Sequence, residues 1–259
     1  MSEQTARVAW VTGAGRGIGR AIALRLARDG LALAVNDIDA KSARAVQEEI
    51  EAAGGRAMSV PGDISDEATV VDIIARIREE FGGLDVLVAN AGVIHIGSML
   101  DTSLEDFDRV QNVNVRGVFL CGREAGRQMV EQGRGKIINA ASVGGRRGGP
   151  DQLAYSASKF AIIGMTQCMA YEFAPYGITV NAYCPGVVDT RMYEYVDAVR
   201  SDAKGIERGA ALEAIVKTIP LGRQEQPEDV ANLVSFLASP ESNYMTGQAI
   251  NVCGGIQMN

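Results

Sequence analysis

A tyrosine and a lysine stand one helical turn apart in the segment LAYSASKF, which covers residues 153–160. Side chains four positions apart lie on the same face of a helix, so the ammonium of Lys159 can approach the phenol of Tyr155. A free tyrosine has a pKa of ~10, which is too high for an efficient base at neutral pH. A neighbouring positive charge stabilises the phenolate, and we expect it to lower that pKa. The pair therefore predicts a site that exchanges a proton with a substrate hydroxyl.

A glycine-rich segment near the N-terminus predicts a second kind of chemistry. VTGAGRGIG, residues 11–19, follows a short β-branched run and opens a helical pattern. Glycines permit a tight turn and let backbone N–H groups approach a pyrophosphate, whose negative charge the N-terminus of the helix favours. The position of the motif between an expected strand and an expected helix indicates a dinucleotide site.

An acidic residue predicts which dinucleotide binds. Asp37 ends the second expected strand, where a carboxylate accepts hydrogen bonds from the adenosine ribose and repels a 2′-phosphate. Two other interpretations stay open. Arg16 in the glycine loop could meet a 2′-phosphate, and Asp37 could instead cap the following helix, a role for which Asp39 is equally suited. We expect NAD.

The composition excludes several classes of protein. The 259 residues carry a net charge of −7, which argues against nucleic-acid binding. No apolar run is long enough to span a membrane, and the first residues lack a secretion signal, so we expect a cytoplasmic protein. We expect Cys121, Cys168, Cys184 and Cys253 to be reduced core thiols. No cluster has metal-ligand spacing, and we expect no metal.

Hydrophobic patterning alternates between strand-like and helix-like segments along the chain. Strands are expected at 7–12, 31–37, 56–63, 84–92, 135–142, 177–186 and 247–255, helices at 17–30, 41–55, 67–83, 153–173 and 227–239, and two helical stretches at roughly 103–131. This alternation predicts an α/β fold, a Rossmann-type doubly wound parallel sheet of about seven strands with helices on both faces. We expect a single domain over residues 1–259.

One segment breaks the alternation. Residues 188–222 are charged and irregular, and they follow the sixth expected strand. Ligands of open α/β sheets bind outside the carboxyl ends of the strands, so this segment could form a lid over the substrate. A surface excursion or a subunit contact is the alternative.

Four groups of residues, in order along the chain, resemble the motifs of the short-chain dehydrogenases/reductases. Thr12, Gly13, Gly17 and Gly19 fit the glycine motif; Asn90, Ala91 and Gly92 fit the fourth-strand motif; Asn114, Ser142, Tyr155 and Lys159 fit the catalytic tetrad; and PGVVDT, residues 185–190, fits the motif after the sixth strand. The resemblance covers nearly the whole chain. It implies hydride transfer between a nicotinamide ring and a secondary alcohol or ketone.

The resemblance also implies residue roles. Ser142 would hold the substrate oxygen, Lys159 would hydrogen-bond the nicotinamide ribose, and Asn114 would fix a water that links Lys159 to solvent. The implied cofactor contacts are Gly13, Arg16, Gly17, Ile18, Gly19, Asp37, Asp63, Ile64, Asn90, Ala91, Gly92, Tyr155, Lys159, Pro185, Gly186, Val188 and Thr190. The implied substrate contacts are Ser142, Val143, Tyr155, Ile94, His95 and Met192, although His95 could equally be a loop residue without a role.

The substrate class is the least constrained prediction. The chain is most similar to the branch that handles small diols, hydroxyketones and polyols, which places a glutamine where this chain has the apolar Val143. A 3-oxoacyl-carrier-protein reductase is an alternative, for which Arg146 and Arg147 could contact an acidic carrier. A non-catalytic dinucleotide-binding sensor is an alternative of another class. Members of the family are usually tetramers, so a homotetramer is expected.

Overall fold

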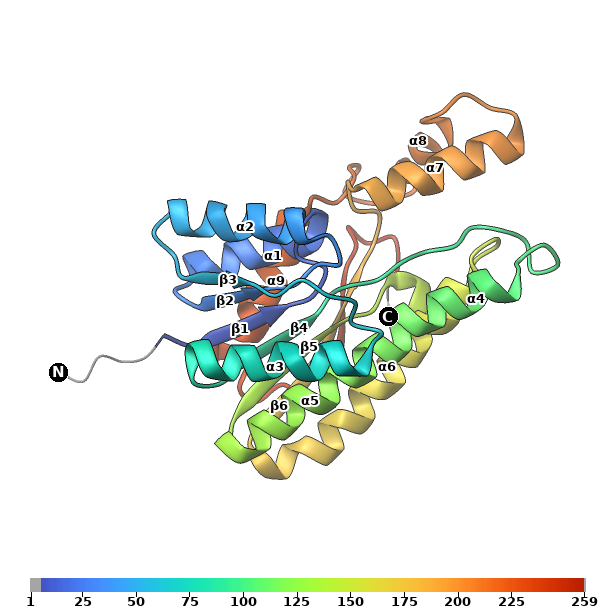
Figure 1. Cartoon of the computed structure of the whole chain (residues 1–259). Coiled ribbons are helices and arrows are strands. Elements are labelled where there is room, and N and C mark those ends of the chain that lie inside the picture. The colour runs from blue at the N-terminus through green and yellow to red at the C-terminus, as the bar shows by residue number, and fades with distance from the viewer. Residues whose placement is uncertain (1–5, 259) are drawn as a thin grey trace.

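The computed structural model describes residues 6–258, which form one seven-stranded sheet (Figure 1). The strands are β1 (Val8–Val11), β2 (Ala32–Val35), β3 (Ala57–Ser59), β4 (Val86–Ala89), β5 (Gly135–Ala140), β6 (Ile178–Pro185) and β7 (Ala249–Val252). Their order in the sheet is β3-β2-β1-β4-β5-β6-β7, and all neighbours are parallel. The predicted parallel sheet is confirmed.

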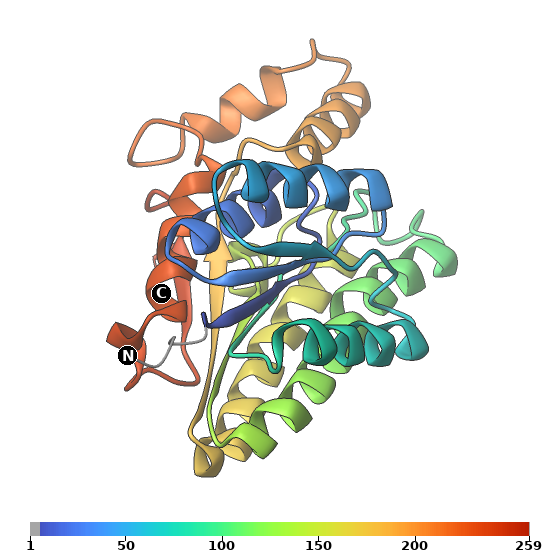
Figure 2. The ribbon, with the colours of Figure 1, turned by 60° about the vertical axis from the view of Figure 1, so that its left-hand side comes forward.

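Helices cover both faces of this sheet. They are α1 (Gly17–Arg28), α2 (Ala40–Ala52), α3 (Glu67–Phe81), α4 (Leu104–Gln111), α5 (Gly117–Gln132), α6 (Leu153–Phe173), α7 (Arg191–Lys204), α8 (Ala210–Val216) and α9 (Pro227–Ala238). Figure 2 shows α1 and α2, in blue, on one face, and α3, α5 and α6 on the other. The predicted helices on both faces are therefore present.

The strands supply two hydrophobic cores. In β1, Val8 and Trp10 face the core formed with α3, α5 and α6, whereas Ala9 and Val11 face the core formed with α1, α2 and α9. Successive side chains of a strand point to opposite faces, so a strand buried on both faces needs apolar residues at every position. Trp10, the only tryptophan of the chain, is fully buried. This explains why the strand sequences are nearly continuous apolar runs.

The strand order reverses between β1 and β4, and this fixes where a ligand can bind. From β1 the chain proceeds outward to β2 and β3, then returns to β4 on the other side of β1. The loops after β1 and β4 leave the sheet in opposite directions, so a crevice opens at their carboxyl ends.

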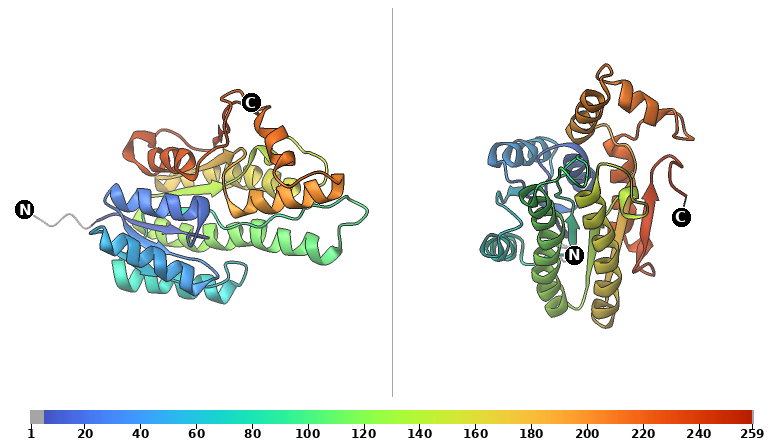
Figure 3. Two further views of the ribbon diagram at one scale, coloured as in Figure 1. Left: turned by 90° about the horizontal axis from the view of Figure 1, so that it is seen from above. Right: turned by 90° about the vertical axis from the view of Figure 1, so that its right-hand side faces the viewer.

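The segment at 188–222 is largely helical, which corrects the prediction of an irregular excursion. It contains α7 and α8, which project beyond the sheet in Figure 1 and are drawn in orange from two further directions in Figure 3. The carboxylate of Asp197 in α7 accepts hydrogen bonds from the N–H groups of Gly209 (2.5 Å) and Leu212 (2.8 Å), so it joins the two helices. Few apolar residues mark α7 in the sequence because its buried positions include Asp197 and Ser201.

Cys168 also departs from the prediction. Cys121, Cys184 and Cys253 are buried, but Cys168 is exposed, because it lies on the side of α6 that faces away from the sheet. All four cysteines are free thiols. Within residues 6–258, no helix is both long and apolar enough to cross a membrane.

Candidate functional site

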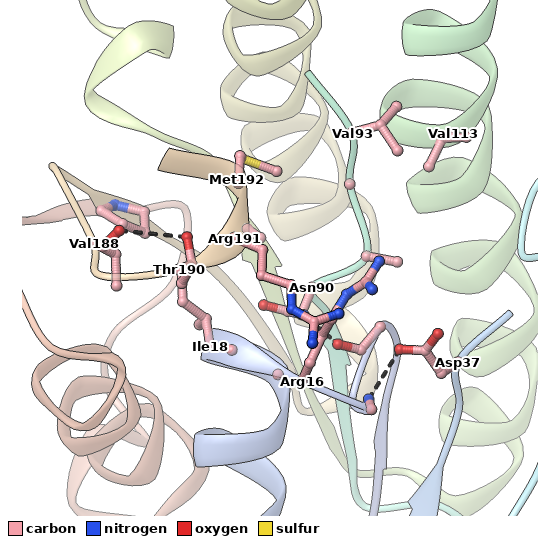
Figure 4. A pocket seen from close by; sticks show the side chains of 18 of the residues that line it. Arg16, Ile18, Asp37, Asn90, Val93, Val113, Val188, Thr190, Arg191 and Met192 are labelled. Carbon is pink, nitrogen blue, oxygen red and sulfur yellow. Dashed lines mark hydrogen bonds between the residues drawn. The ribbon is translucent and has the colours of Figure 1, made fainter. Parts of the chain in front are cut away.

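A cavity of about 610 Å³ opens at the carboxyl ends of the strands, where the strand order reverses (Figure 4). Every residue expected to bind the cofactor lines it, from the glycine loop through Asp37 and Asn90 to Thr190. Ser142, Tyr155 and Met192 line the same cavity. The structure thus brings together, in one pocket, residues that come from the ends of six of the seven strands, β1 to β6.

The glycine loop leaves no room for side chains at two positions. Gly13 has a φ of +61°, and a Cβ there would lie 2.8 Å from the Cα of Ala91. A Cβ on Gly19 would collide with the carbonyl oxygen of Gly13. The backbone is therefore bare where α1 begins, which is the geometry that a pyrophosphate requires.

Asn90 holds this loop in place. Its Nδ2 donates to the carbonyl oxygens of Thr12 (3.0 Å) and Gly13 (3.1 Å), and its Oδ1 accepts from the hydroxyl of Tyr183 (2.9 Å). One amide side chain thereby connects the ends of β1, β4 and β6. The side chain of Asn90 is thus satisfied within the protein and acts on the shape of the loop.

Asp37 and Asp39 have different roles. The carboxylate of Asp37 accepts from the N–H groups of Gly15 (2.9 Å) and Asp39 (3.0 Å), and the residue is 7% exposed at the cavity wall. Asp39 is the N-cap of α2 and accepts from the N–H of Lys41 (3.0 Å). The alternative that Asp37 caps the helix is therefore excluded.

Two arginines add positive charge to the cavity. Arg16 and Arg191 are both exposed and both line it, and neither guanidinium group forms a hydrogen bond or ion pair with any residue of the described range 6–258. Figure 4 shows Arg191 extending from the start of α7 toward the glycine loop. Unpartnered guanidinium groups and bare backbone fit the pyrophosphate of a dinucleotide. Sequence reasoning missed Arg191, although it directly follows the PGVVDT motif.

Ser142, Tyr155 and Lys159 form a cluster at the other end of the cavity, in which Ser142 and Lys159 are buried and Tyr155 is partly buried. Ser142 interacts with the Tyr155 side chain, and its Oγ accepts from the N–H of Gly144 (3.0 Å). Lys159 Nζ donates to the carbonyl oxygen of Ala140 (2.7 Å) and lies 5.6 Å from the centre of the Tyr155 ring. The expected proximity of lysine and phenol is present.

The effect on the Tyr155 pKa is the reverse of the expected one. Burial raises the pKa of Tyr155, and the hydrogen bond from Ser142 offsets only part of that increase. Burial also lowers the pKa of Lys159 to about 8. Desolvation acts on both groups and favours the neutral phenol and the neutral amine, so it outweighs their attraction in this state of the protein.

Asn114 lies in a π-helical turn, Asn112–Arg116, between α4 and α5. Its amide is buried; Oδ1 accepts from the N–H of Val93 (2.8 Å), and Nδ2 donates to Val93 O and Ser158 Oγ, each at 2.9 Å. Single π-helical turns within helices are frequent at functional sites. The role of Asn114 toward Lys159 stays a prediction.

The expected substrate contacts divide into two groups. Ser142, Tyr155 and Met192 line the cavity, whereas Val143, Ile94 and His95 are not among its lining residues. His95 instead lies 3.3 Å (Nδ1) from Asp106 Oδ1. Val93, Val113 and Tyr193 line the cavity without having been singled out, and Figure 4 shows the first two close to each other.

Comparisons with known proteins agree with this geometry. The family described as "Enoyl-(Acyl carrier protein) reductase" matches residues 13–257. A short-chain dehydrogenase/reductase of Armillaria gallica is 51% identical, with 96% of this chain and 95% of that protein covered. The L-2,3-butanediol dehydrogenase of Corynebacterium glutamicum is 46% identical over 98% and 99% of the two chains. A 3-oxoacyl-[acyl-carrier-protein] reductase of Synechocystis is 42% identical over the full length of both.

A solved structure agrees as well. The crystal structure of a short-chain type dehydrogenase/reductase from Mycobacterium marinum superimposes with a TM-score of 0.89 at 36% identity, over 98% of this chain and 97% of that one. The fold and the cavity define an oxidoreductase that binds a nicotinamide dinucleotide and acts on alcohol or ketone groups. The chain belongs to the short-chain dehydrogenase/reductase family.

Proposed function

We propose that the protein is an NAD-dependent dehydrogenase that interconverts a secondary alcohol and a ketone, with Ser142, Tyr155, Lys159 and Asn114 as its catalytic residues. The observation that carries the proposal is the Ser142–Tyr155–Lys159 cluster in a cavity whose opposite end holds Asp37. Asp37 follows β2 and lines the cavity, and an acid at this position accepts hydrogen bonds from the adenosine ribose and repels a 2′-phosphate. This favours NAD over NADP.

The chain's own groups handle the proton. In alcohol oxidation, Tyr155 accepts the proton of the substrate hydroxyl, and Ser142 donates a hydrogen bond to the same oxygen. Lys159 supplies the positive charge that a phenolate needs. The dinucleotide supplies, when bound, the ring carbon that accepts or returns hydride. Because the phenol and the amine are both shifted toward neutrality by burial, Tyr155 can also return the proton in ketone reduction.

The substrate is proposed to be a small diol, hydroxyketone or polyol. The similarity to the L-2,3-butanediol dehydrogenase supports this class. The cavity wall near Tyr155 includes Val93, Val113 and Met192, which are apolar, and Tyr193, which adds a hydroxyl. We propose that α7 and α8 act as a lid over the substrate, because Met192 and Tyr193 belong to α7. Few directing polar groups favour a broad substrate range.

A 3-oxoacyl-carrier-protein reductase remains the second candidate, favoured by the full-length similarity to the Synechocystis protein. One contact weakens it. The guanidinium of Arg146 donates to the carbonyl oxygen of Ala249 and is partly buried, so it does not offer its charge to an acidic carrier. This corrects the expectation that Arg146 and Arg147 are both available at the surface; Arg147 alone is exposed.

The decisive experiment records NADH formation from NAD, with NADP in parallel, over small diols, sugar alcohols and simple secondary alcohols. Tyr155→Phe is the blank, because it removes the proton carrier and keeps the ring. Oxidation with NAD that vanishes in the variant supports the proposal. Activity only with NADP, or only on a 3-oxoacyl thioester, supports the second candidate. Tight NADH binding without turnover of any carbonyl compound supports the non-catalytic sensor.

A homotetrameric, cytoplasmic enzyme is the remaining part of the proposal. Phe119 on α5 and Phe160 on α6 are 46% and 48% exposed, which suits helix faces that pack against another copy. The four free thiols suit a reducing compartment. Light scattering coupled to size-exclusion chromatography tests the assembly, and a monomer at micromolar concentration would contradict it.

A further inference from the structure

Glu225 lies behind the wall of the cavity, between α8 and α9, and pairs with the segment that follows β6. Val188 and Glu225 form an isolated parallel bridge. The N–H of Glu225 donates to Val187 O (2.9 Å), and the carbonyl oxygen of Glu225 accepts from the N–H of Asp189 (2.8 Å). Any residue except proline could make these two backbone bonds.

The side chain of Glu225 adds a bond that depends on its identity. Its Oε2 accepts from the N–H of Gly186 at 2.8 Å, and the same N–H also reaches Val252 O in β7 at 2.9 Å. The residue is only 6% exposed. Together, the three bonds of Glu225 span residues 186–189, and Gly186, Val188 and Asp189 line the cavity on their other side.

The second oxygen of this carboxyl is an anomaly. Oε1 is buried and has no hydrogen-bond partner within residues 6–258. A buried polar atom without a partner costs free energy, and a buried charge costs more. The loop could have been closed by an apolar residue with the same backbone bonds, so the carboxyl is retained at a cost that its bond to Gly186 must justify.

We propose that Glu225 is a positioning residue for the cofactor: its carboxyl holds residues 186–190 in the shape that receives the nicotinamide half of the dinucleotide. This rests on the proposed function and on the cofactor contacts of Pro185, Gly186, Val188 and Thr190 that the family resemblance implies, which we assign to the nicotinamide half. Glu225 touches neither substrate nor cofactor. It acts through the backbone of Gly186 and the strand-like pairing with Val188.

Burial of Glu225 makes the stability of the fold depend on pH. Burial raises the pKa of Glu225 to about 7, the repulsion of Asp229 adds to the rise, and Gly186 N–H and Arg223 oppose it. The surrounding titratable groups are Tyr193 from α7, Asp229 from α9 and Arg223 from its own loop. The folded-state pKa is raised above its ordinary value of 4.5, so the stability contribution is complete below about pH 4.5 and is lost as the pH rises to about 7. The protonated and the ionised carboxyl both offer Oε2 to Gly186, so the positioning bond persists across this range.

Calorimetric titration with two ligands tests the proposal. NADH is the probe for the whole site, because its ring is uncharged and therefore is not attracted by a carboxylate. ADP-ribose lacks the nicotinamide and reports the rest of the pocket. Glu225→Ala should weaken NADH binding about tenfold, the order expected for one buried hydrogen bond, and leave ADP-ribose binding within about twofold. Equal losses for both ligands, or no loss for NADH, would overturn the proposal.

A second variant separates positioning from a failure to fold. Glu225→Gln keeps the acceptor for Gly186 and removes the titration, so it should bind NADH as tightly as the parent at about pH 6. Between about pH 5 and pH 8, the free energy of unfolding should fall in the parent relative to this variant, because only the parent buries a carboxyl that ionises. Weak NADH binding by folded Glu225→Gln would refute the positioning role. Glu228→Gln, an exposed change of the same charge three positions away, is the matched control. These readouts need no turnover, so they stand even if the proposed catalytic roles fail.

Discussion

The two ends of the cavity treat their polar groups differently. At the glycine-loop end, the carboxylate of Asp37 has two backbone N–H donors, and the amide of Asn90 is bonded to three partners. At the tyrosine end, Lys159 is buried and Tyr155 is partly buried, and within residues 6–258 neither has an oppositely charged partner. The carboxylate and the amide of the first end are paired within the protein, whereas the phenol and the amine of the second end have no counter-charge.

This difference identifies the tyrosine end as the part of the site that lowers the stability of the folded protein. Desolvation raises the pKa of Tyr155 and lowers the pKa of Lys159, so it disfavours the charged form of each side chain. Residues kept at such a cost are typical of sites that need poised acids and bases. The glycine-loop end instead contributes shape, and the buried side chains of Asp37 and Asn90 cost little because both are paired.

The largest expected effect is at Lys159. Replacing Lys159→Met should reduce kcat/KM by ~10²- to 10⁴-fold, because the charge that supports proton transfer is lost. The same variant should be more stable than the parent at neutral pH, by roughly 1–3 kcal/mol, because a desolvated ammonium is removed. Steady-state kinetics and urea unfolding measure the two effects.

The pH dependence of that gain follows from the direction of the shift. The folded-state pKa of Lys159 is lowered from 10.5 to about 8, so the parent regains stability as the pH rises from about 8 to 10.5, and the gain of the variant shrinks there. Lys136→Met is the matched control, since burial lowers the pKa of Lys136 to about 8 as well and the residue lies outside this cavity. It should gain stability and keep activity. A loss of activity in Lys136→Met would show that the effect of Lys159→Met is not specific to the tyrosine end of the cavity.

The next largest effect, on dinucleotide affinity, is expected at the glycine-loop end of the cavity. Gly19→Ala places a methyl group against the carbonyl oxygen of Gly13, so dinucleotide affinity should fall roughly 10- to 100-fold. Calorimetry with ADP-ribose measures the loss without involving the tyrosine end. Gly164→Ala in α6, where a Cβ meets nothing within 4 Å, should bind normally. Normal binding by Gly19→Ala would show that the loop is less rigid than its contacts indicate.

A smaller effect concerns the choice of dinucleotide. Asp37→Ser removes the carboxylate that repels a 2′-phosphate, so the ratio of kcat/KM for NAD to that for NADP should fall about tenfold. The unpartnered Arg16 is then free to attract the phosphate. Parallel kinetics with the two cofactors measure the ratio. An unchanged ratio would mean that Asp37 does not govern the preference.

The smallest effect sharpens the distinction between two neighbouring acids. Asp39→Ala removes the N-cap of α2 and should cost about 1 kcal/mol of stability, with no change in the preference between NAD and NADP. Thermal unfolding and the same pair of kinetic assays give both quantities. A shift in cofactor preference would reassign part of the role of Asp37 to Asp39.

The glycine-loop end of the cavity was largely predictable from the sequence. The glycine loop, Asp37 and Asn90 act through backbone shape and short-range spacing, which a linear sequence contains. The seven strands were predictable for the same reason, since burial on both faces demands continuous apolar runs. Only the boundaries differ: the third strand, expected over 56–63, is Ala57–Ser59.

At the tyrosine end of the cavity, the residues were predictable from the sequence, but the directions of their pKa shifts were not. Spacing placed Lys159 beside Tyr155, but burial decides the direction of their pKa shifts, and burial depends on contacts among α6, β5 and β6. No sequence pattern indicated a role for Glu225, because its partner Gly186 lies 39 positions away. Arg146 was likewise expected at the surface, but its guanidinium donates to the carbonyl oxygen of Ala249 in β7.

The single tryptophan gives the sheet a built-in optical reporter. Trp10 sits at the centre of β1, in register with Ala34 of β2 and Leu87 of β4, two positions before Thr12. Its indole is dry and its N–H has no partner within residues 6–258, so its emission should be blue-shifted and free of overlap from another indole. Because α7 and α8 contain no tryptophan, loss of this signal marks the opening of the central sheet and does not report movement of α7 and α8.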